Sequence, residues 1–249
     1  QYYAPTLYEP SLDRDMHDVF DGSTDPYQNF VLRMVLAISL QKLDSAYAGL
    51  ADSYYLAAMK YFEKIIRPKD LKTLQCLVLV AQYSLLTPTQ TAICYVVGLA
   101  TRLCQQLGLT EEKTIVQGVP HEQPNPIHLD MRRRLAWIIL SMEYGLAHTM
   151  GRPNSFASGQ DQVDIKFFEP IDDEYITADG ILPGPISEKK MVAIHVLRMR
   201  LLQAEIRRVL YEKKRPEPEN EHHPWYNEIQ NKMKNWLDTS PKNPCWCWS

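Results

Sequence analysis

The residues best able to bind a metal ion lie near the end of the sequence. Cys245 and Cys247 are separated by one tryptophan, and His222 and His223 are adjacent in a polar stretch. A structural zinc site needs about four converging ligands, and its paired cysteines are about two to four residues apart. No second cysteine pair and no HExxH sequence completes either group. We therefore predict no metal site and no cofactor.

Groups able to perform catalysis are also sparse. Asp172, Asp173 and Glu174 are adjacent, but an acid–base pair needs converging geometry, so we interpret them as solvated or helix-capping charges. Glu143 and His148 share an expected helix, but their separation does not place them on one face. The sequence contains no GxSxG motif and no phosphate-binding loop. We therefore expect that the protein is not an enzyme, and we assign no catalytic residue.

The densest basic spot is the triplet Arg132, Arg133 and Arg134. Consecutive helical residues point in different directions, so the triplet cannot present one basic face to a nucleic acid. At least one arginine must face the interior, where an acid or a backbone carbonyl would pair with it. We predict structural ion pairing, for which the planar guanidinium is well suited.

Stretches of helical apolar spacing must position these residues. Asp25 and Asp70 precede two of them as N-caps, and Gly108 and Gly151 follow two others as C-terminal caps. Between them, 110–126 and 152–185 lack periodicity and are predicted to be irregular. Helices are predicted from 26 onward and over 51–66, 71–86, 88–107, 129–150, 187–214 and 224–237. We therefore predict an all-α fold, a multi-helix bundle of stacked antiparallel helix pairs with long connecting loops.

Composition narrows the class of protein. The chain has 249 residues, of which 45% are hydrophobic, and a formal net charge of -3. This length suits a single domain over 1–249, and the charge argues against DNA binding through phosphates. Five cysteines without framework spacing favour a reducing intracellular compartment. No apolar run is long enough to span a membrane, and a first residue Gln1 suggests a fragment or a processed product.

Several of these motifs occur in an order that resembles a known family. Leu107-Gly108-Leu109 follows an amphipathic helix, the arginine triplet is followed closely by Trp137, and Gly151-Arg152-Pro153 ends that helix. Asp164-Ile165 and Pro170-Ile171-Asp172-Asp173-Glu174 come next. The sequence is similar to the fungal-specific transcription factor domain, the middle homology region of binuclear zinc-cluster regulators. The similarity extends from about Phe30 to Tyr211.

The resemblance implies a nuclear regulatory domain within a larger transcription factor. Such domains restrain or license an activation segment, contact transcription machinery or co-regulators, and in some members bind a small hydrophobic inducer. DNA would be bound only by a zinc-cluster domain that this chain lacks, and a homodimer is compatible with the family. Glu143-Tyr144-Gly145 replaces an Asp-Arg pair of the family pattern.

The resemblance also suggests roles for individual residues. Arg132, Arg133, Arg134, Trp137, Gly151, Arg152 and Pro153 would be structural positions of the family motif. We expect Arg152 to brace the following loop against the helices. If a ligand pocket exists, its wall would be formed by Trp137, Met142, Tyr144 and His148, and the alternative is that these residues are core.

Two other functions stay open. A stand-alone domain without a DNA-binding partner could bind a small molecule or act as an enzyme through Glu143, His148 or the acidic residues 172–174. A protein-interaction scaffold is the other alternative, for which the tryptophan-rich tail 245–249 gives slight support.

Overall fold

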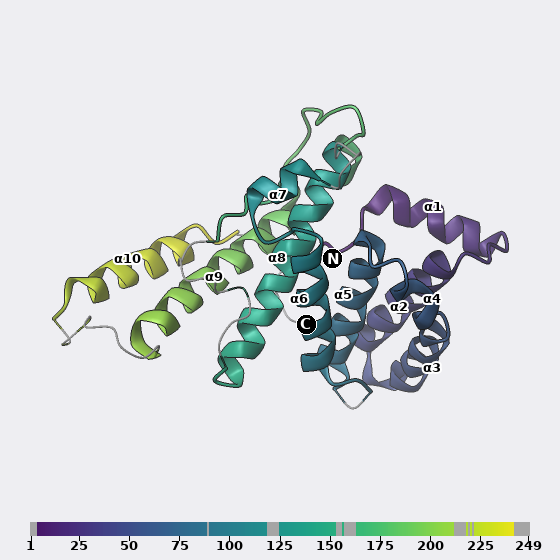
Figure 1. Cartoon of the computed structure of the whole chain (residues 1–249), viewed down its shortest axis with the longest axis horizontal. Coiled ribbons are helices and arrows are strands. Elements are labelled where there is room, and N and C mark those ends of the chain that lie inside the picture. Colours follow the sequence, from purple (N-terminus) through teal and green to yellow (C-terminus); the bar gives the residue numbers. More distant parts are fainter. Residues whose placement is uncertain are drawn as a thin grey trace.

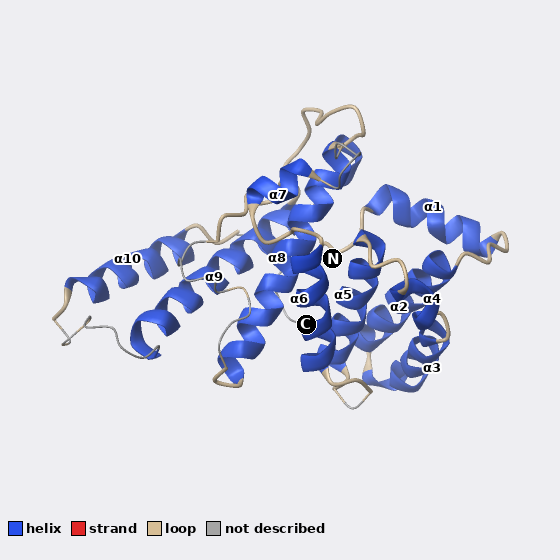
Figure 2. Cartoon of the chain, in the orientation of Figure 1, coloured by secondary structure: helices blue, strands red, loops and turns tan. Residues whose placement is uncertain are grey.

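The computed structural model describes residues 4–88, 90–118, 125–152, 156, 163–211, 218, 220 and 222–241. Within these ranges the secondary structure consists of ten α-helices and two 3₁₀ turns, with only two isolated β-bridges (Figure 2). The elements are α1 (Glu9–Phe20), α2 (Pro26–Leu43), η1 (Ser45–Tyr47), α3 (Ala48–Met59), α4 (Phe62–Ile66), α5 (Leu71–Leu86), α6 (Ile93–Gln106), α7 (Glu112–Gln117), α8 (Pro126–Thr149), η2 (Asp173–Tyr175), α9 (Glu188–Tyr211) and α10 (Pro224–Asp238). The all-α prediction is confirmed. Pro153 and the tail 245–249 lie outside the described residues.

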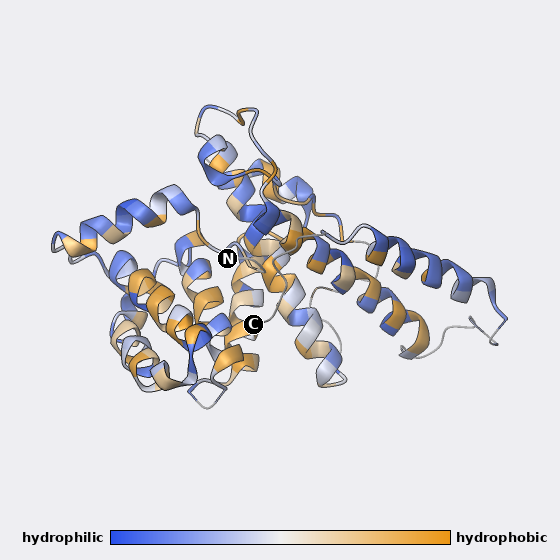
Figure 3. Ribbon diagram, turned by 180° about the vertical axis from the view of Figure 1, so that it is seen from behind, coloured by the Kyte–Doolittle hydropathy of each residue, from blue (hydrophilic) through white to orange (hydrophobic). Residues whose placement is uncertain are grey.

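The helices form a bundle with an extension on one side. Helices α2 to α6 pack together, α8 runs through the middle of the molecule, and α9 with α10 extends away from the bundle (Figure 1). Helix α5 is the most enclosed element, since every residue from 73 to 81 is buried. A helix that is apolar on all sides is stable only inside a core. Helices α2 and α6 each contact α5, and their buried apolar residues belong to the same core cluster; the hydrophobic stretches of the ribbon are concentrated in this part of the molecule (Figure 3).

The predicted helix caps are confirmed by hydrogen bonds. The Asp25 carboxylate accepts from the Gln28 backbone N–H at 2.9 Å, and the Asp70 carboxylate accepts from that of Thr73 at 2.8 Å. Gly108 and Gly151 have φ values of 65° and 63°, the left-handed conformation that ends a helix. These ends are fixed by residues close in sequence, so they could be predicted without knowing the fold.

Two predicted helices have different bounds in the structure. The expected helix over 51–66 is broken after Met59, and Tyr61 packs against the core with the Arg33 guanidinium 5.4 Å from its ring centroid. The helix expected from Pro88 begins at Ile93 instead. The residues before Ile93 form a turn, in which the Thr91 hydroxyl is 2.5 Å from that of Tyr55. Tertiary contacts therefore overrode local helical preference at both places.

Two helices were missed by the sequence analysis. Helix α7 lies within the segment predicted as a loop, where α8 stabilises its short backbone, as described below. Helix α1 has no residue that is fully buried. None of the described helices combines the length and the apolar character required to cross a membrane.

Candidate functional site

The arginine triplet of α8 is used entirely inside the fold. Arg132 is buried and donates to the backbone carbonyls of Ile115, Leu107 and Thr114 at 3.1, 3.2 and 3.3 Å. It thereby satisfies carbonyl groups near the ends of α6 and α7. Burial lowers the pKa of its guanidinium. The prediction that the interior would supply carbonyl or acidic partners is confirmed.

Arg133 pairs with Glu112, the first residue of α7, through a bidentate contact. The Glu112 carboxylate also accepts from the backbone N–H of Lys166 at 3.0 Å. Burial alone would raise the pKa of Glu112, but the Arg133 guanidinium and the Lys166 N–H outweigh it and the pKa is lowered. Glu112 therefore ties α7, α8 and the segment after residue 163 together.

Arg134 lies in a buried cluster of charges that we call the Asp173 cluster: Asp130, Arg134, Asp173 and Lys190. The Arg134 guanidinium is 2.5 Å from the carboxylates of both Asp130 and Asp173, and the Lys190 ammonium is 2.7 Å from Asp173. All four residues are buried. Burial alone would raise the pKa of Asp173, but Arg134 and Lys190 lower it. The interpretation of Asp173 as a solvated charge was therefore wrong.

The Asp173 cluster also holds the beginning of α1. Asp173 accepts from the backbone N–H of Glu9 at 2.9 Å, and the neighbouring Tyr8 hydroxyl donates to the Ile176 carbonyl at 2.7 Å. Farther along α1, the Gln28 side chain of α2 donates to Asp15 and Asp18 at 2.9 and 2.8 Å. Polar contacts therefore position α1 together with the half-buried Leu12, which packs against the core.

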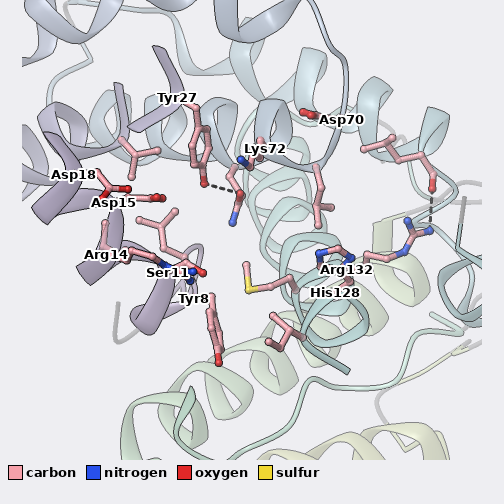
Figure 4. Close-up of a pocket in the computed structure, with 18 of the residues that line it drawn as sticks. Tyr8, Ser11, Arg14, Asp15, Asp18, Tyr27, Asp70, Lys72, His128 and Arg132 are labelled. Carbon is pink, nitrogen blue, oxygen red and sulfur yellow. Dashed lines mark hydrogen bonds between the residues drawn. The ribbon is translucent and has the colours of Figure 1, made fainter. Parts of the chain in front are cut away.

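A cavity of about 690 Å³ lies between α1, α2, α5 and α8. Its buried surface includes Leu7, Val31 and Met131, and its charged residues come from opposite sides (Figure 4). Cavities of this size are typical of small-molecule sites. We call it the α1 cavity. Its acidic and basic lining residues are Arg14, Asp15, Asp18, Asp70, Lys72, His128 and Arg132.

The residues predicted as a ligand wall lie elsewhere on α8. Trp137 is buried, donates to the Lys166 carbonyl at 3.0 Å and stacks on Phe167 with ring centroids 4.5 Å apart. Met142 and Tyr144 are half-buried against the core, and His148 is exposed. None of the four lines the α1 cavity. Their role in ligand binding stays a prediction.

The end of the family motif is arranged by backbone contacts. The Arg152 N–H donates to the Ala147 carbonyl at 3.0 Å, and the Arg152 carbonyl accepts from the Arg207 guanidinium of α9 at 2.7 Å. The Arg152 side chain itself is exposed. The link between this loop and the helices therefore runs through the main chain of Arg152 and the side chain of Arg207.

No group of three or more potential metal ligands is found among the residues described. The His223 imidazole accepts from the backbone N–H of Trp225 at 3.2 Å and caps α10. Cys245 and Cys247 lie outside the described ranges.

Comparison with known proteins decides the family. The family model of the fungal specific transcription factor domain matches residues 1–238. The chain belongs to this family. The resemblance inferred from the order of motifs is thus confirmed, and the match covers nearly the whole chain.

Several fungal regulators are similar to this transcription factor domain. Pyrimidine pathway regulatory protein 1 of Saccharomyces cerevisiae is 28% identical over 231 residues, which are 88% of this chain and 24% of the relative. The positive regulator of purine utilization of Emericella nidulans is 27% identical over 191 residues, 64% of this chain and 18% of the relative. Activator of stress genes protein 1 of Candida albicans is 28% identical over 204 residues, 76% and 20% of the two chains.

The transcription factor domain therefore spans about a quarter or less of the length of these relatives. No solved structure matches it. The relatives are named as regulators, which agrees with the prediction that the chain is not an enzyme.

The α1 cavity is the feature of this transcription factor domain that sequence reasoning missed. A signal was present, because Leu12, Met16 and Val19 recur at helical spacing behind Pro10. These residues are only half-buried, so the pattern predicts a helix without revealing that it covers a cavity.

Proposed function

We propose that this chain is the regulatory domain of a larger nuclear transcription factor and that a small molecule controls it. The family match over residues 1–238 is the observation that carries the first part. One apolar cluster extends from α2 to α9, which supports a single domain over 1–249. In such a factor, a separate zinc-cluster domain would bind DNA, and this domain would communicate with co-regulators or the transcription machinery.

The use of the basic residues supports this division of labour. Arg132, Arg133 and Arg134 are consumed by carbonyls and carboxylates within the fold. A DNA-binding surface needs basic side chains that are free to neutralise phosphates. With a formal net charge of -3 as well, the domain is suited to regulation rather than to reading DNA.

The α1 cavity supports the ligand-controlled part of the proposal. A ligand shifts an equilibrium only by binding one arrangement better than another. Helix α1 forms one wall through polar contacts and buries none of its own residues, so its position can respond to what fills the cavity. The wall predicted around Trp137, Met142, Tyr144 and His148 is a second place at which a ligand could act.

Metabolites are the first compounds to test. Two relatives are named for the pyrimidine pathway and for purine utilization, so pyrimidine and purine metabolites should be screened by thermal shift. A ligand present at about 100 times its Kd adds about 2.7 kcal/mol to the folding free energy and raises Tm measurably. If no compound raises Tm, ligand control is rejected and a partner-controlled domain is left.

A cavity-filling variant then connects binding with transcription. Ser11 of α1 lines the cavity, and Ser11→Phe would occupy part of it. Ser53→Phe on the exposed face of α3 is the matched control. In the full-length factor with a reporter gene, Ser11→Phe should abolish the response to the compound, whereas Ser53→Phe should retain it. A normal response of Ser11→Phe would argue against control through this cavity.

Binding of another protein is the second candidate function. Tyr95 and Leu99 on α6 and Leu85 at the end of α5 are 82%, 51% and 58% exposed. Tyr95 and Leu99 lie four residues apart and therefore on one face of α6, and adjacent exposed apolar residues are typical of interaction surfaces. A homodimer or a co-regulator would be detected by light scattering of the chain alone and by loss of association in Tyr95→Ser.

A further inference from the structure

The charges around the α1 cavity define the chemistry of the molecule that fits it. We infer that the cavity binds a small organic anion with an apolar body, and that α1 closes over this anion. The inference rests on the proposed ligand control and names the class of ligand.

Three basic side chains reach the cavity from three different helices. Arg14 comes from α1, Lys72 from α5 and His128 from α8 (Figure 4). Among the residues described, the side chains of Arg14 and His128 have no hydrogen-bond or ion-pair partner. The Lys72 ammonium lies 4.8 Å from the centroid of the Tyr27 ring and has no carboxylate within ion-pair distance in the same ranges. All three residues are exposed, so their N–H groups are open to solvent and to a ligand from several directions.

The acids of the cavity, in contrast, already accept hydrogen bonds from protein donors. Asp15 and Asp18 both receive the Gln28 side-chain amide. Asp70 accepts from the backbone N–H of Thr73 at 2.8 Å and from its hydroxyl at 3.0 Å. Arg132 is likewise occupied by backbone carbonyls. The N–H groups of Arg14 and His128 are thus unused by the described part of the protein, whereas the three carboxylates accept neutral donors and keep their charges, so that the formal lining charges balance.

The remainder of the lining requires an apolar body. The half-buried Leu12, Leu71 and Ile127 line the cavity and offer apolar surface to a ligand. The other apolar lining residues, Leu7, Val31 and Met131, lie buried. Filling the site with a purely hydrophobic molecule would remove water from Arg14 and Lys72 without replacing its hydrogen bonds, which is costly. An anion with a ring or a short apolar chain satisfies both parts of the lining, because a charge-assisted hydrogen bond replaces the lost water.

Binding of such an anion would fix α1. Arg14 belongs to α1, whereas Lys72 and His128 belong to the bundle, so an anion between them links the two. The existing links include the Gln28 contacts, the two hydrogen bonds at Tyr8 and Glu9, and an exposed ion pair at 3.4 Å between Glu9 and Lys189 of α9. The Glu9 bond ends on Asp173, which also holds Lys190 of α9. The state of α1 is thereby connected to the helix that extends from the bundle.

Matched pairs of probes test the class of ligand. Indole-3-carboxylate, phenyl phosphate and neutral indole-3-carboxamide would be titrated into the 249-residue chain and followed by NMR. We expect the carboxylate to bind about tenfold more tightly than the amide, as charged hydrogen bonds are about twice as strong as neutral ones. Phenyl phosphate distinguishes a preference for phosphate from one for carboxylate. The amides of α1 should also exchange more slowly with solvent when the anion is bound.

Variants locate the anion. Arg14→Gln, Lys72→Gln and His128→Gln should each lower the affinity for the carboxylate and leave that for the amide nearly unchanged. Arg102→Gln, on the exposed side of α6 and outside the cavity, is the matched control and should bind like the original chain. Equal affinities for acid and amide, saturation by none of the probes, or chemical-shift changes confined to the second half of α8 would overturn the inference.

Failure of the inference and failure of the proposed function give different results. Neutral compounds that bind the cavity and change reporter activity would reject the anion but keep ligand control. The Arg14→Gln variant could instead lose anion binding and still show an unchanged reporter response in the full-length factor. This result would support the anion site and reject its role in regulation.

Discussion

Replacing Asp173 with alanine tests whether the Asp173 cluster holds the segment after residue 163 and α1 onto the bundle. The carboxylate pairs with Arg134 of α8 and with Lys190 of α9, and it accepts the backbone N–H of Glu9. In Asp173→Ala, the Lys190 ammonium loses its ion pair while it stays buried. Arg134 keeps Asp130 as a partner at 2.5 Å, so the loss falls mainly on Lys190 and on the start of α1.

The size of the effect follows from these contacts. Removing one partner from a buried ion pair costs about 3–5 kcal/mol. Because Arg134 keeps one carboxylate, we expect the lower end, about 3 kcal/mol. For a chain of this length, each kcal/mol lowers Tm by about 2–4 °C, so Tm should fall by roughly 6–12 °C.

Urea denaturation and calorimetry would measure the change. Asp173→Asn keeps an oxygen that can accept from Glu9 and should lose less stability, which provides a folded variant if the alanine variant does not fold. The exposed Asp179→Ala is the matched control and should change stability by less than about 0.5 kcal/mol. A loss below about 1 kcal/mol in Asp173→Ala would contradict the reasoning, because it would mean that the cluster is compensated or solvated.

The contacts of Asp173, Arg132 and Trp137 predict three further results. The pKa of Asp173 is lowered because Arg134 and Lys190 outweigh its burial; its stabilisation is therefore complete above its unfolded pKa of about 3.9 and is lost at lower pH. Urea curves of the original chain and of Asp173→Asn should accordingly converge as the pH falls below about 4. Arg132→Met removes three hydrogen bonds to carbonyls and should lower the free energy of unfolding by about 2–3 kcal/mol. Relative to the original chain, hydrogen exchange should accelerate more in α7 than in α5. Trp137→Phe keeps the ring stacking but loses the bond to the Lys166 carbonyl, so it should cost about 1 kcal/mol in denaturation.

The positions of the long helices follow from the sequence because their signals are local. Asp25 and Asp70 cap helices through N–H groups three residues away, and apolar residues recur once per helical turn. Gly108 and Gly151 end helices because they adopt positive φ without a steric cost. The order of the family motifs is also contained in the sequence, and it identified the family without any structural information.

The destinations of the charged residues required the tertiary structure. The triplet predicts that an arginine turns inward, but Arg134 meets Asp173 across 39 positions of sequence, and no local pattern distinguishes Asp173 from its acidic neighbours. Helix α7 is similar, since its six residues depend on Arg132 and Arg133 of α8 rather than on intrinsic propensity.

The α1 cavity shows most clearly which features follow from the sequence and which require the tertiary structure. The sequence predicts that α2, α5 and α8 are helices, since capping and periodicity act within about one turn, whereas α1 was recognised only in the structure. Whether Arg14, Lys72 and His128 surround one space depends on how those helices cross, and that is set by packing among residues far apart in sequence. The sequence alone therefore determined the class of fold and the family, and only the tertiary structure decided where a ligand could bind.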